Sequence, residues 1–284
     1  MSEEVKIEDL KDIKIPFRLI SRGIPLYSRE EWAANAKANA GLPEVEKTMT
    51  PRGRKLAIIG GGPSVAEHAE ELRAWDGDIW SVNRTSNWLV PNGIRSVLYA
   101  VDACPDPNYW PNPENVDGAI MAVMCAPNIV AMYRPIQLFD VHLSADMQYI
   151  GGSTAVTSSM TLVAAMGYRD VHYFGCEGSF GFTDHIDRDD APAKQLIVRA
   201  GGVDYRTDPQ MYLQCQEMEW LFRKFPHHYK NRSGGLLEAM SVHRNWEVVV
   251  VNAAFREQLE KENARDGMFD GQYVQQKGDD RASA

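Results

Sequence analysis

The chain has 284 residues, enough for one large domain or two small ones, and its 44% hydrophobic and 24% charged content is typical of a globular protein. Its formal net charge of -9 excludes loose, charge-driven binding to nucleic acid or anionic membrane, but not a local basic pocket. No apolar run is long enough to span a bilayer, and the acidic N-terminus MSEEVKIEDLKD lacks the apolar core of a signal peptide.

The four cysteines lie far apart and form no C-x-x-C pair. We therefore expect reduced thiols in a cytoplasmic protein rather than a zinc site or a disulfide framework. The cysteines are Cys104, Cys125, Cys176 and Cys215.

Residues 1–54 predict a peripheral arm. Apolar residues alternate over 13–19, which is typical of an edge strand. An alanine-rich helix is expected over 30–40, with Ser28 as its N-cap and a stop at Gly41. We expect the arm to pack on the domain or on a partner subunit, so a homo-oligomer is one alternative.

The stretch 55–71, KLAIIGGGPSVAEHAEE, organises the rest of the chain. A buried strand over Leu56–Ile59 runs directly into Gly60, Gly61 and Gly62, which allow positive φ and close approach of a ligand. Pro63 stops the strand, and Ser64 is placed as the N-cap of a helix over 65–75.

Glu67 completes a capping box with Ser64 in this interpretation. The N–H groups and the dipole at such a helix start attract anions, most often phosphate. The pattern departs from the dinucleotide fingerprint because Val65 replaces the third glycine, and no G-K-[ST] follows as in a P-loop. A plain strand-to-helix turn is the alternative.

Further strands and helices alternate along the chain. Strands are expected over 78–82, 96–101, 119–124, 171–174 and 248–251, the last one buried, and helices over 153–166 and 236–240. This order predicts an α/β, Rossmann-like, doubly wound and mostly parallel sheet with a helical C-terminal extension. We divide the chain into the arm 1–54, a nucleotide-binding domain 55–255 whose segment 191–245 is mainly helical, and a charged tail 256–284 expected to be disordered.

Ligands of such sheets bind at the carboxyl ends of the strands. The residues expected at that edge are Gly60–Ser64, Asn83, Asp102, Glu177 and Asn252. We expect the ends that carry Gly60, Asn83, Asp102, Ser153 and Glu177 to face one shared crevice.

Residues 55–188 resemble the 6-hydroxymethylpterin diphosphokinase-like family, which also includes the flagellin-glycosylating motility accessory factors. The shared motifs are GGGPS, VNR, VD, GGSTA and GYRDVHYFG, the last leading into an acidic loop with His185. IIGGGPS with Asn83 is also similar to the bacterial sialyltransferases that use a CMP-sugar. The chain departs from the family at Glu177, where an aspartate is usual.

The resemblance implies a Rossmann-like nucleotide site and a transferase, without choosing the group transferred. The nucleotide-binding residues on these motifs are Gly60, Gly61, Gly62, Pro63, Ser64, Asn83, Arg84, Gly152, Ser153 and Thr154.

The glycine loop carries no lysine, so phosphate charge must be met by the helix start, by Arg84 or by a metal such as Mg²⁺. Asp102 can coordinate Mg²⁺ or bond a ribose hydroxyl, or it can simply cap its loop. Glu177 and His185 can serve as general base or metal ligands, although a solvated loop is the alternative. The catalytic candidates are therefore Glu177, His185 and Asp102, with Asp102 and Glu177 as the metal candidates.

Other polar and aromatic residues favour structural roles. His172 lies inside a strand, and Tyr109 and Trp110 can stack on a base but more often pack a proline-rich loop. The basic residues His227, His228, Lys230 and Arg232 can bind an anionic acceptor, although a solvated helix end is favoured.

The leading hypothesis is glycosyl transfer from a nucleotide sugar, bound at Gly60–Ser64, to an unidentified acceptor. Diphosphate transfer from ATP to a small hydroxymethyl acceptor is the first alternative, and a non-enzymatic nucleotide-binding or assembly protein is the second.

Overall fold

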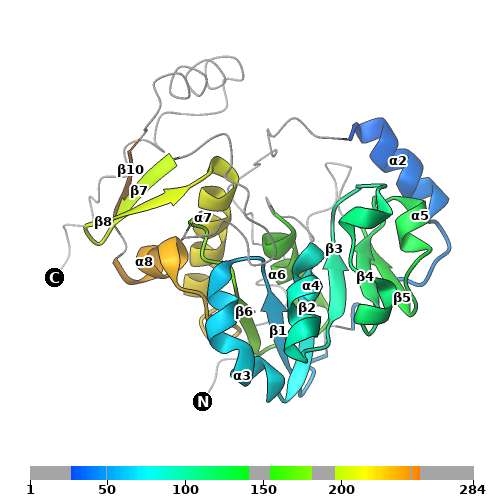
Figure 1. Cartoon of the computed structure of the whole chain (residues 1–284), viewed down its shortest axis with the longest axis horizontal. Helices are drawn as coiled ribbons and strands as arrows, with labels where there is room; N and C mark the ends of the chain where they lie inside the picture. The colour runs from blue at the N-terminus through cyan, green and yellow to red at the C-terminus, as the bar shows by residue number, and fades with distance from the viewer. Residues whose placement is uncertain (1–26, 49, 141–153, 181–195, 244, 250–284) are drawn as a thin grey trace.

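A seven-stranded parallel sheet forms the centre of the molecule (Figure 1). The computed structural model describes residues 27–48, 50–140, 154–180, 196–243 and 245–249. The strand order is β5-β4-β3-β2-β1-β6-β9. The strands are β1 (Lys55–Ile59), β2 (Gly77–Val82), β3 (Val97–Ala100), β4 (Ala119–Ala122), β5 (Ile136–Phe139), β6 (Val171–Phe174) and β9 (Tyr229–Asn231).

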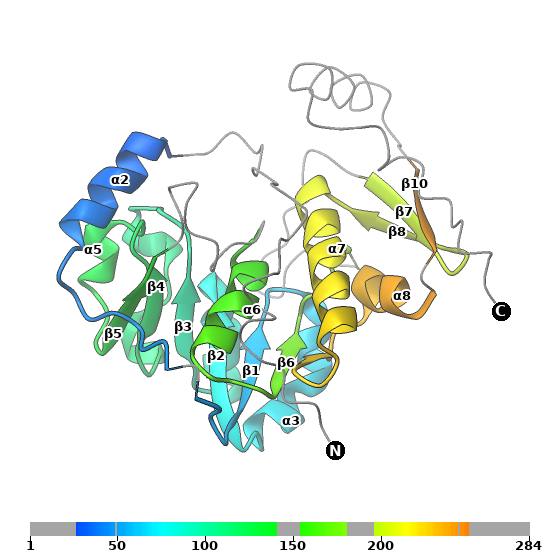
Figure 2. The same cartoon turned by 180° about the vertical axis from the view of Figure 1, so that it is seen from behind.

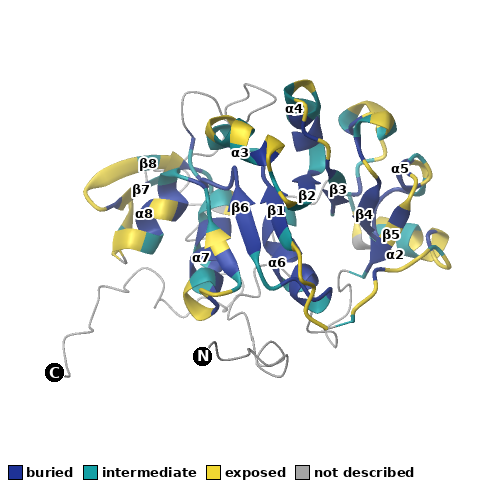
Figure 3. Cartoon of the chain, turned by 90° about the horizontal axis from the view of Figure 1, so that it is seen from below, coloured by how far each residue is buried: buried dark blue, intermediate teal, exposed yellow. Residues whose placement is uncertain are grey.

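Helices cover both faces of this sheet. Figures 1 and 2 place α3 (Ala69–Arg73) and α4 (Ser86–Leu89) on one face, and α6 (Ala155–Ala165) and α7 (Pro209–Lys224) on the other. The side chains of β1 alternate between the two faces, so Leu56 and Ile58 join the larger apolar cluster while Ala57 and Ile59 join the smaller one. The buried strands form the dark centre of Figure 3. The predicted α/β, doubly wound and mostly parallel fold is confirmed.

The strand order changes direction at β1. Strands β2 to β5 follow one another on one side of β1, whereas β6 and β9 lie on its other side. Such a switch point opens a crevice at the carboxyl ends of the two flanking strands, here β1 and β6.

The described part of the arm packs on the far edge of the sheet. The helix α2 (Arg29–Ala38) begins at Ser28, whose capping box with Glu31 agrees with the predicted N-cap. Beyond the helix, Val45 N–H donates to Leu138 O and Leu138 N–H donates to Pro43 O, which covers the open edge of β5. The expected strand over 13–19 lies outside the described residues.

The segment 191–245 is only partly helical. It contains α7 and α8 (Gly235–His243), and the latter agrees with the helix expected over 236–240. It also contains β7 (Leu196–Ala200) and β8 (Val203–Thr207), which form an antiparallel sheet with β10 (Trp246–Val249) in the order β10-β7-β8. Gly201 and Gly202 join β7 to β8 with φ of +59° and +81°, the geometry of a tight hairpin turn that the sequence reading missed.

Two expected strands need correction, and two strands of the core sheet were not predicted. The strand expected over 119–124 ends at Ala122, and the unpredicted strands are β5 and β9. The strand expected over 248–251 is β10, which belongs to the small sheet rather than to the core, and Val248 is 41% exposed there. The helix expected over 153–166 is confirmed as α6, followed by Gly167 in the left-handed conformation.

Within the described ranges, no helix combines the length and the apolar character needed to cross a bilayer.

One buried side chain contributes two hydrogen bonds to the docking of the arm. Asn39 Nδ2 donates to Val123 O at 2.9 Å and to Cys125 O at 2.8 Å. Because Asn39→Ala leaves buried carbonyl groups without donors, we expect it to lower the free energy of unfolding by about 1–3 kcal/mol. Urea denaturation measures this change. The exposed Lys37 of α2 is the control, and Lys37→Ala should stay within about 0.5 kcal/mol of the parent. Equal stability of the two variants would contradict the docking.

Candidate functional site

A cavity of about 240 Å³ lies at the carboxyl ends of β1, β2 and β6. Its walls come from the loops after these three strands, from the first turn of α6 and from α7. Predicted site residues among its lining are Gly61, Gly62, Asn83, Arg84, Thr154 and Glu177. Of the five residues expected to face one crevice, Asn83 and Glu177 line this cavity, Gly60 and Asp102 do not, and Ser153 lies outside the described residues.

The glycines after β1 allow two loops to meet. Gly62 N–H donates to Gly175 O at 2.8 Å. A Cβ on Gly60 would lie 2.4 Å from Gly175 O, and one on Gly62 would collide with the carboxylate of Glu177. Neither Gly60 nor Gly62 has positive φ, whereas Gly175 on the facing loop has φ of +64°. These two glycines are therefore required by close packing between loops rather than by a left-handed turn.

Glu177 occupies the anion position that the sequence assigned to phosphate. Its Oε1 accepts the backbone N–H of Ser64, and the side chain is buried with 6% exposed. The predicted capping box of Ser64 with Glu67 is wrong. The turn that follows is the six-residue 3-10 helix η1 (Pro63–His68), its N-cap is Gly62, and no side chain caps it.

The first turn of α6 supplies a better anion site. Thr154 is its N-cap and shares a capping box with Thr157, while Thr154 Oγ1 donates to Gln214 Oε1 at 2.8 Å. Ala155 and Val156 line the cavity, and the N–H groups of a first helical turn have no acceptor within the helix. Gly152 and Ser153 lie outside the described residues. Gln214 was not predicted, because nothing in the sequence places α7 beside this turn.

Two residues of the cavity lining each carry a buried oxygen atom that has no hydrogen-bond partner among the described residues. The two atoms are Asn83 Oδ1 and Glu177 Oε2. Asn83 also has φ of +50°, a conformation that costs energy in a residue other than glycine and is common at functional sites. Oxygen atoms of this kind favour a ligand with hydroxyl groups or a bound cation.

Arg84 is the basic residue of the cavity wall. Its guanidinium carbon lies 5.6 Å from the centre of the Tyr109 ring, and both residues line the cavity. The neighbouring Trp110 is buried, and its Nε1 donates to Cys104 O at 2.9 Å. Trp110 therefore packs its loop, while Tyr109 presents an aromatic side chain at the cavity.

Asp102 is not among the residues that line this cavity. Its Oδ1 accepts the N–H of Cys104 at 2.9 Å, which is the loop-capping alternative. Within the described part of the chain, no three acidic, histidine or cysteine side chains are grouped to hold a metal ion. Of the predicted metal pair, only Glu177 lines the cavity, and a metal role for the two carboxylates stays a prediction. His185 and Asn252 lie outside them.

The remaining candidates have structural partners. His172 Nε2 lies 2.9 Å from Asp170 Oδ1 and its ring packs on Trp75, and burial lowers the pKa of His172. Lys230 pairs with Asp170 at 2.6 Å, and Arg232 pairs with Glu71 at 2.7 Å. Two of the four basic residues considered for an anionic acceptor, Lys230 and Arg232, are thus held in ion pairs of the fold.

A larger hollow of about 1310 Å³ lies at the opposite, amino-terminal ends of the strands. We take the smaller cavity as the candidate site because ligands of open parallel sheets bind at the carboxyl ends, next to helix N-termini.

Comparison with known proteins supports the fold. No protein-family model matches the chain, and no curated protein is similar to it in sequence. Among solved structures, the chain is similar to the MAf glycosyltransferase from Magnetospirillum magneticum AMB-1, with a TM-score of 0.58 and 14% identity. The match covers 84% of this chain but 42% of that glycosyltransferase, so the chain spans less than half of its length. This likeness agrees with the motility accessory factor part of the sequence resemblance, whereas the diphosphokinase and sialyltransferase parts gain no support.

Variants of Glu177 test its contact with the glycine loop. Glu177→Gln keeps an acceptor for Ser64 N–H, so most of the stability should remain. Because Glu177→Ala leaves this N–H buried and unpaired, we expect it to lower the free energy of unfolding by about 1–3 kcal/mol in urea denaturation. The control is Glu67→Ala, an exposed residue that the sequence assigned to the cap and that should change stability by less than about 0.5 kcal/mol. A large loss for Glu67→Ala with none for Glu177→Ala would restore the capping box.

Proposed function

We propose that the chain is a glycosyltransferase-type enzyme that binds a nucleotide-activated sugar in the cavity at the carboxyl ends of β1, β2 and β6. One observation carries the proposal. The same small cavity, at the switch point of the sheet, is lined by the start of α6, by Arg84 and by two residues with buried oxygen atoms that accept no hydrogen bond. This combination suits a ligand that carries both phosphate and hydroxyl groups.

The donor phosphate belongs at the start of α6 in this proposal. The N–H groups of Ala155 and Val156 and the guanidinium of Arg84 supply positive charge there. The N–H of Ser64 is taken by Glu177, whose negative charge keeps a phosphate away from the glycine loop. This revises the role of Gly60–Ser64, which now shapes the wall of the site instead of gripping phosphate.

Hydroxyl groups of the ribose or of the sugar belong at Asn83 Oδ1 and Glu177 Oε2. Each buried acceptor gains a donor when such a hydroxyl binds, which removes the penalty of leaving it unpaired. Tyr109 is suited to contact the base. The volume of about 240 Å³ is slightly below the usual range of small-molecule pockets, so the cavity encloses one part of the donor.

Mg²⁺ is proposed only as a ligand shared with the donor. It is commonly held by one or two carboxylates together with substrate phosphates, and Glu177 Oε2 offers one such oxygen. When bound, the metal would neutralise phosphate charge. His185 stays a predicted general acid or base, because histidine titrates near neutral pH.

Ligand-induced stabilisation tests the proposal. A ligand that binds only the native state raises the melting temperature, so we expect nucleoside monophosphates and nucleotide sugars to stabilise the protein. The panel also contains ATP and each ligand with Mg²⁺. Stabilisation by ATP alone, followed by diphosphate transfer, would favour the diphosphokinase alternative. Stabilisation without transfer or hydrolysis of any donor would favour the non-enzymatic alternative, and no stabilisation by any nucleotide would contradict the site.

Substitution of Asn83 separates binding from folding. Asn83→Gly removes the Oδ1 acceptor, but glycine tolerates the φ of +50°, so the fold should be retained or slightly stabilised. We expect nucleotide affinity to fall about tenfold by calorimetry, as for a lost hydrogen bond in a buried site. Asn83→Asp is the matched variant, because it keeps an oxygen atom that can accept a hydrogen bond from a hydroxyl group of the ligand. Unchanged affinity in a folded Asn83→Gly protein would contradict the role of this side chain.

A further inference from the structure

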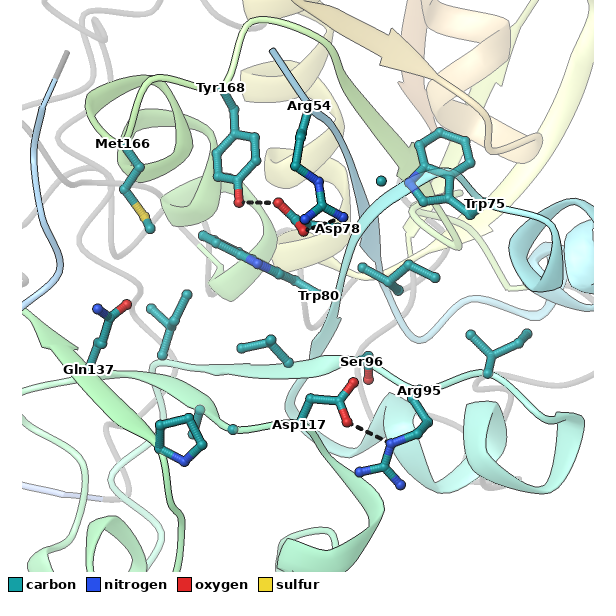
Figure 4. Close-up of a pocket in the computed structure, with 18 of the residues that line it drawn as sticks. Arg54, Trp75, Asp78, Trp80, Arg95, Ser96, Asp117, Gln137, Met166 and Tyr168 are labelled. Carbon is teal, nitrogen blue, oxygen red and sulfur yellow. Dashed lines mark hydrogen bonds and ion pairs between the residues drawn. The ribbon is translucent and has the colours of Figure 1, made fainter. Parts of the chain in front are cut away.

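The hollow at the amino-terminal ends of the strands has no part in the proposed donor site. It measures about 1310 Å³ and is lined by segments around 52–54, 77–80, 93–97, 117–120, 135–137 and 166–168 (Figure 4). Lys55 begins β1 on this side, whereas the donor cavity follows Ile59 at its other end. The volume exceeds the usual range of about 300–1,000 Å³ for small-molecule pockets, which suits an extended ligand.

Basic side chains outnumber acidic ones in this hollow. Four arginines and two aspartates line it, although the whole chain carries a net charge of -9. They are Arg52, Arg54, Arg73, Arg95, Asp78 and Asp117. Arg73 is paired with Glu70 at 3.0 Å, so the excess positive charge that attracts anions to this hollow comes from Arg52.

Arg52 is held in position without a carboxylate partner among the described residues. Its backbone N–H donates to Gly167 O at 2.7 Å, and its Nε donates to Met166 O at 2.8 Å. Its guanidinium carbon also lies 5.2 Å from the centre of the Tyr168 ring. These contacts fix the planar group before any ligand binds, and a fixed guanidinium binds carboxylate or phosphate with little loss of entropy.

Two arginine–aspartate pairs flank the apolar floor that contains Trp80 (Figure 4). On one side Arg54 lies 3.1 Å from Asp78, which also accepts a hydrogen bond from the Tyr168 hydroxyl at 2.7 Å. On the other side Arg95 Nε lies 2.6 Å from Asp117 Oδ1. The side chains of Arg54 and Arg95 are 65% and 55% exposed, so a ligand can reach both pairs.

We propose that this hollow binds an acidic oligosaccharide. Each sugar hydroxyl both donates and accepts, so it can bond to the aspartate and the arginine of one pair at the same time. The carboxylate or phosphate groups of the saccharide pair with Arg52, the arginine of the hollow without a carboxylate partner among the described residues. An acidic peptide fits less well, because glutamate and aspartate side chains bring acceptors but no donors for Asp78 and Asp117.

Calorimetry with defined probes tests the proposal in the full-length chain. The probes are tetragalacturonic acid, the neutral tetrasaccharide maltotetraose and an oligoglutamate peptide of equal charge. We expect the acidic tetrasaccharide to bind about tenfold more tightly than either of the others, and added salt to weaken it. Arg52→Gln and Arg54→Gln should each weaken it by about tenfold, as for a lost charge-assisted hydrogen bond.

Arg223→Gln is the matched control, since it removes one positive charge from an exposed position of α7 outside this hollow. It should leave affinity within about twofold. Arg54→Gln guards against misfolding of Arg52→Gln, because Arg54 is mostly exposed. Equal or tighter binding of the peptide, no binding of the acidic saccharide, or equal weakening by Arg223→Gln would overturn the proposal.

The donor site is tested separately. Binding of the acidic saccharide that is lost in Asn83→Gly and kept in Arg52→Gln would place it in the donor cavity and overturn the second site. Failure of the nucleotide panel leaves the saccharide measurement unaffected, so the two proposals fail independently.

Discussion

The close approach of the loops after β1 and β6 is the constraint on which the rest of the site depends. Gly62 N–H reaches Gly175 O, and the carboxylate of Glu177 reaches Ser64 N–H. A side chain on Gly60 or Gly62 would push these loops apart. The loop after β6 is anchored further by Leu237 N–H, which donates to Glu177 O at 2.9 Å and so ties in α8. At the switch point, the loops after β1 and β6 thus contact each other directly on the side of the glycines. The cavity lies on the other side, toward β2 and α6.

This closure explains why a chain without a phosphate-gripping lysine can still present an anion site. Two helix N-termini lie at this crevice and could bind an anion. The one after the glycine loop is a short 3-10 helix whose Ser64 N–H already donates to the carboxylate of Glu177. In the 11-residue helix α6, Thr154 Oγ1 caps the N–H of Thr157, which leaves the N–H groups of Ala155 and Val156 at the cavity together with a longer run of aligned peptide dipoles. Anionic ligands therefore gain more at α6, across the crevice from the loop that carries the more conspicuous motif.

The sequence predicted the sheet well because apolar runs and turn residues are local signals. The strands expected over 56–59, 78–82 and 171–174 agree closely with β1, β2 and β6. The role of Ser64 was mispredicted because Glu177, which replaces its cap, lies 113 positions away in the chain. Gln214 could not be assigned to the site for the same reason. The hairpin at Gly201 and Gly202 did carry a local signal, because two adjacent glycines there separate two strands. It was missed because the whole segment 191–245 was predicted to be mainly helical.

The polarity of a parallel α/β sheet also explains why the two hollows differ in charge chemistry. Helix N-termini gather at the carboxyl ends of the strands, where they favour anions without many basic side chains. Helix C-termini gather at the amino ends, where exposed carbonyl groups favour cations. Arg52 supplies such a cation, because its Nε donates to Met166 O at the end of α6. Arg73 supplies another in the last turn of α3. Capping by Arg52 Nε needs only one of the five N–H donors of a guanidinium, so the same side chain that completes the helix end can also bind an anion.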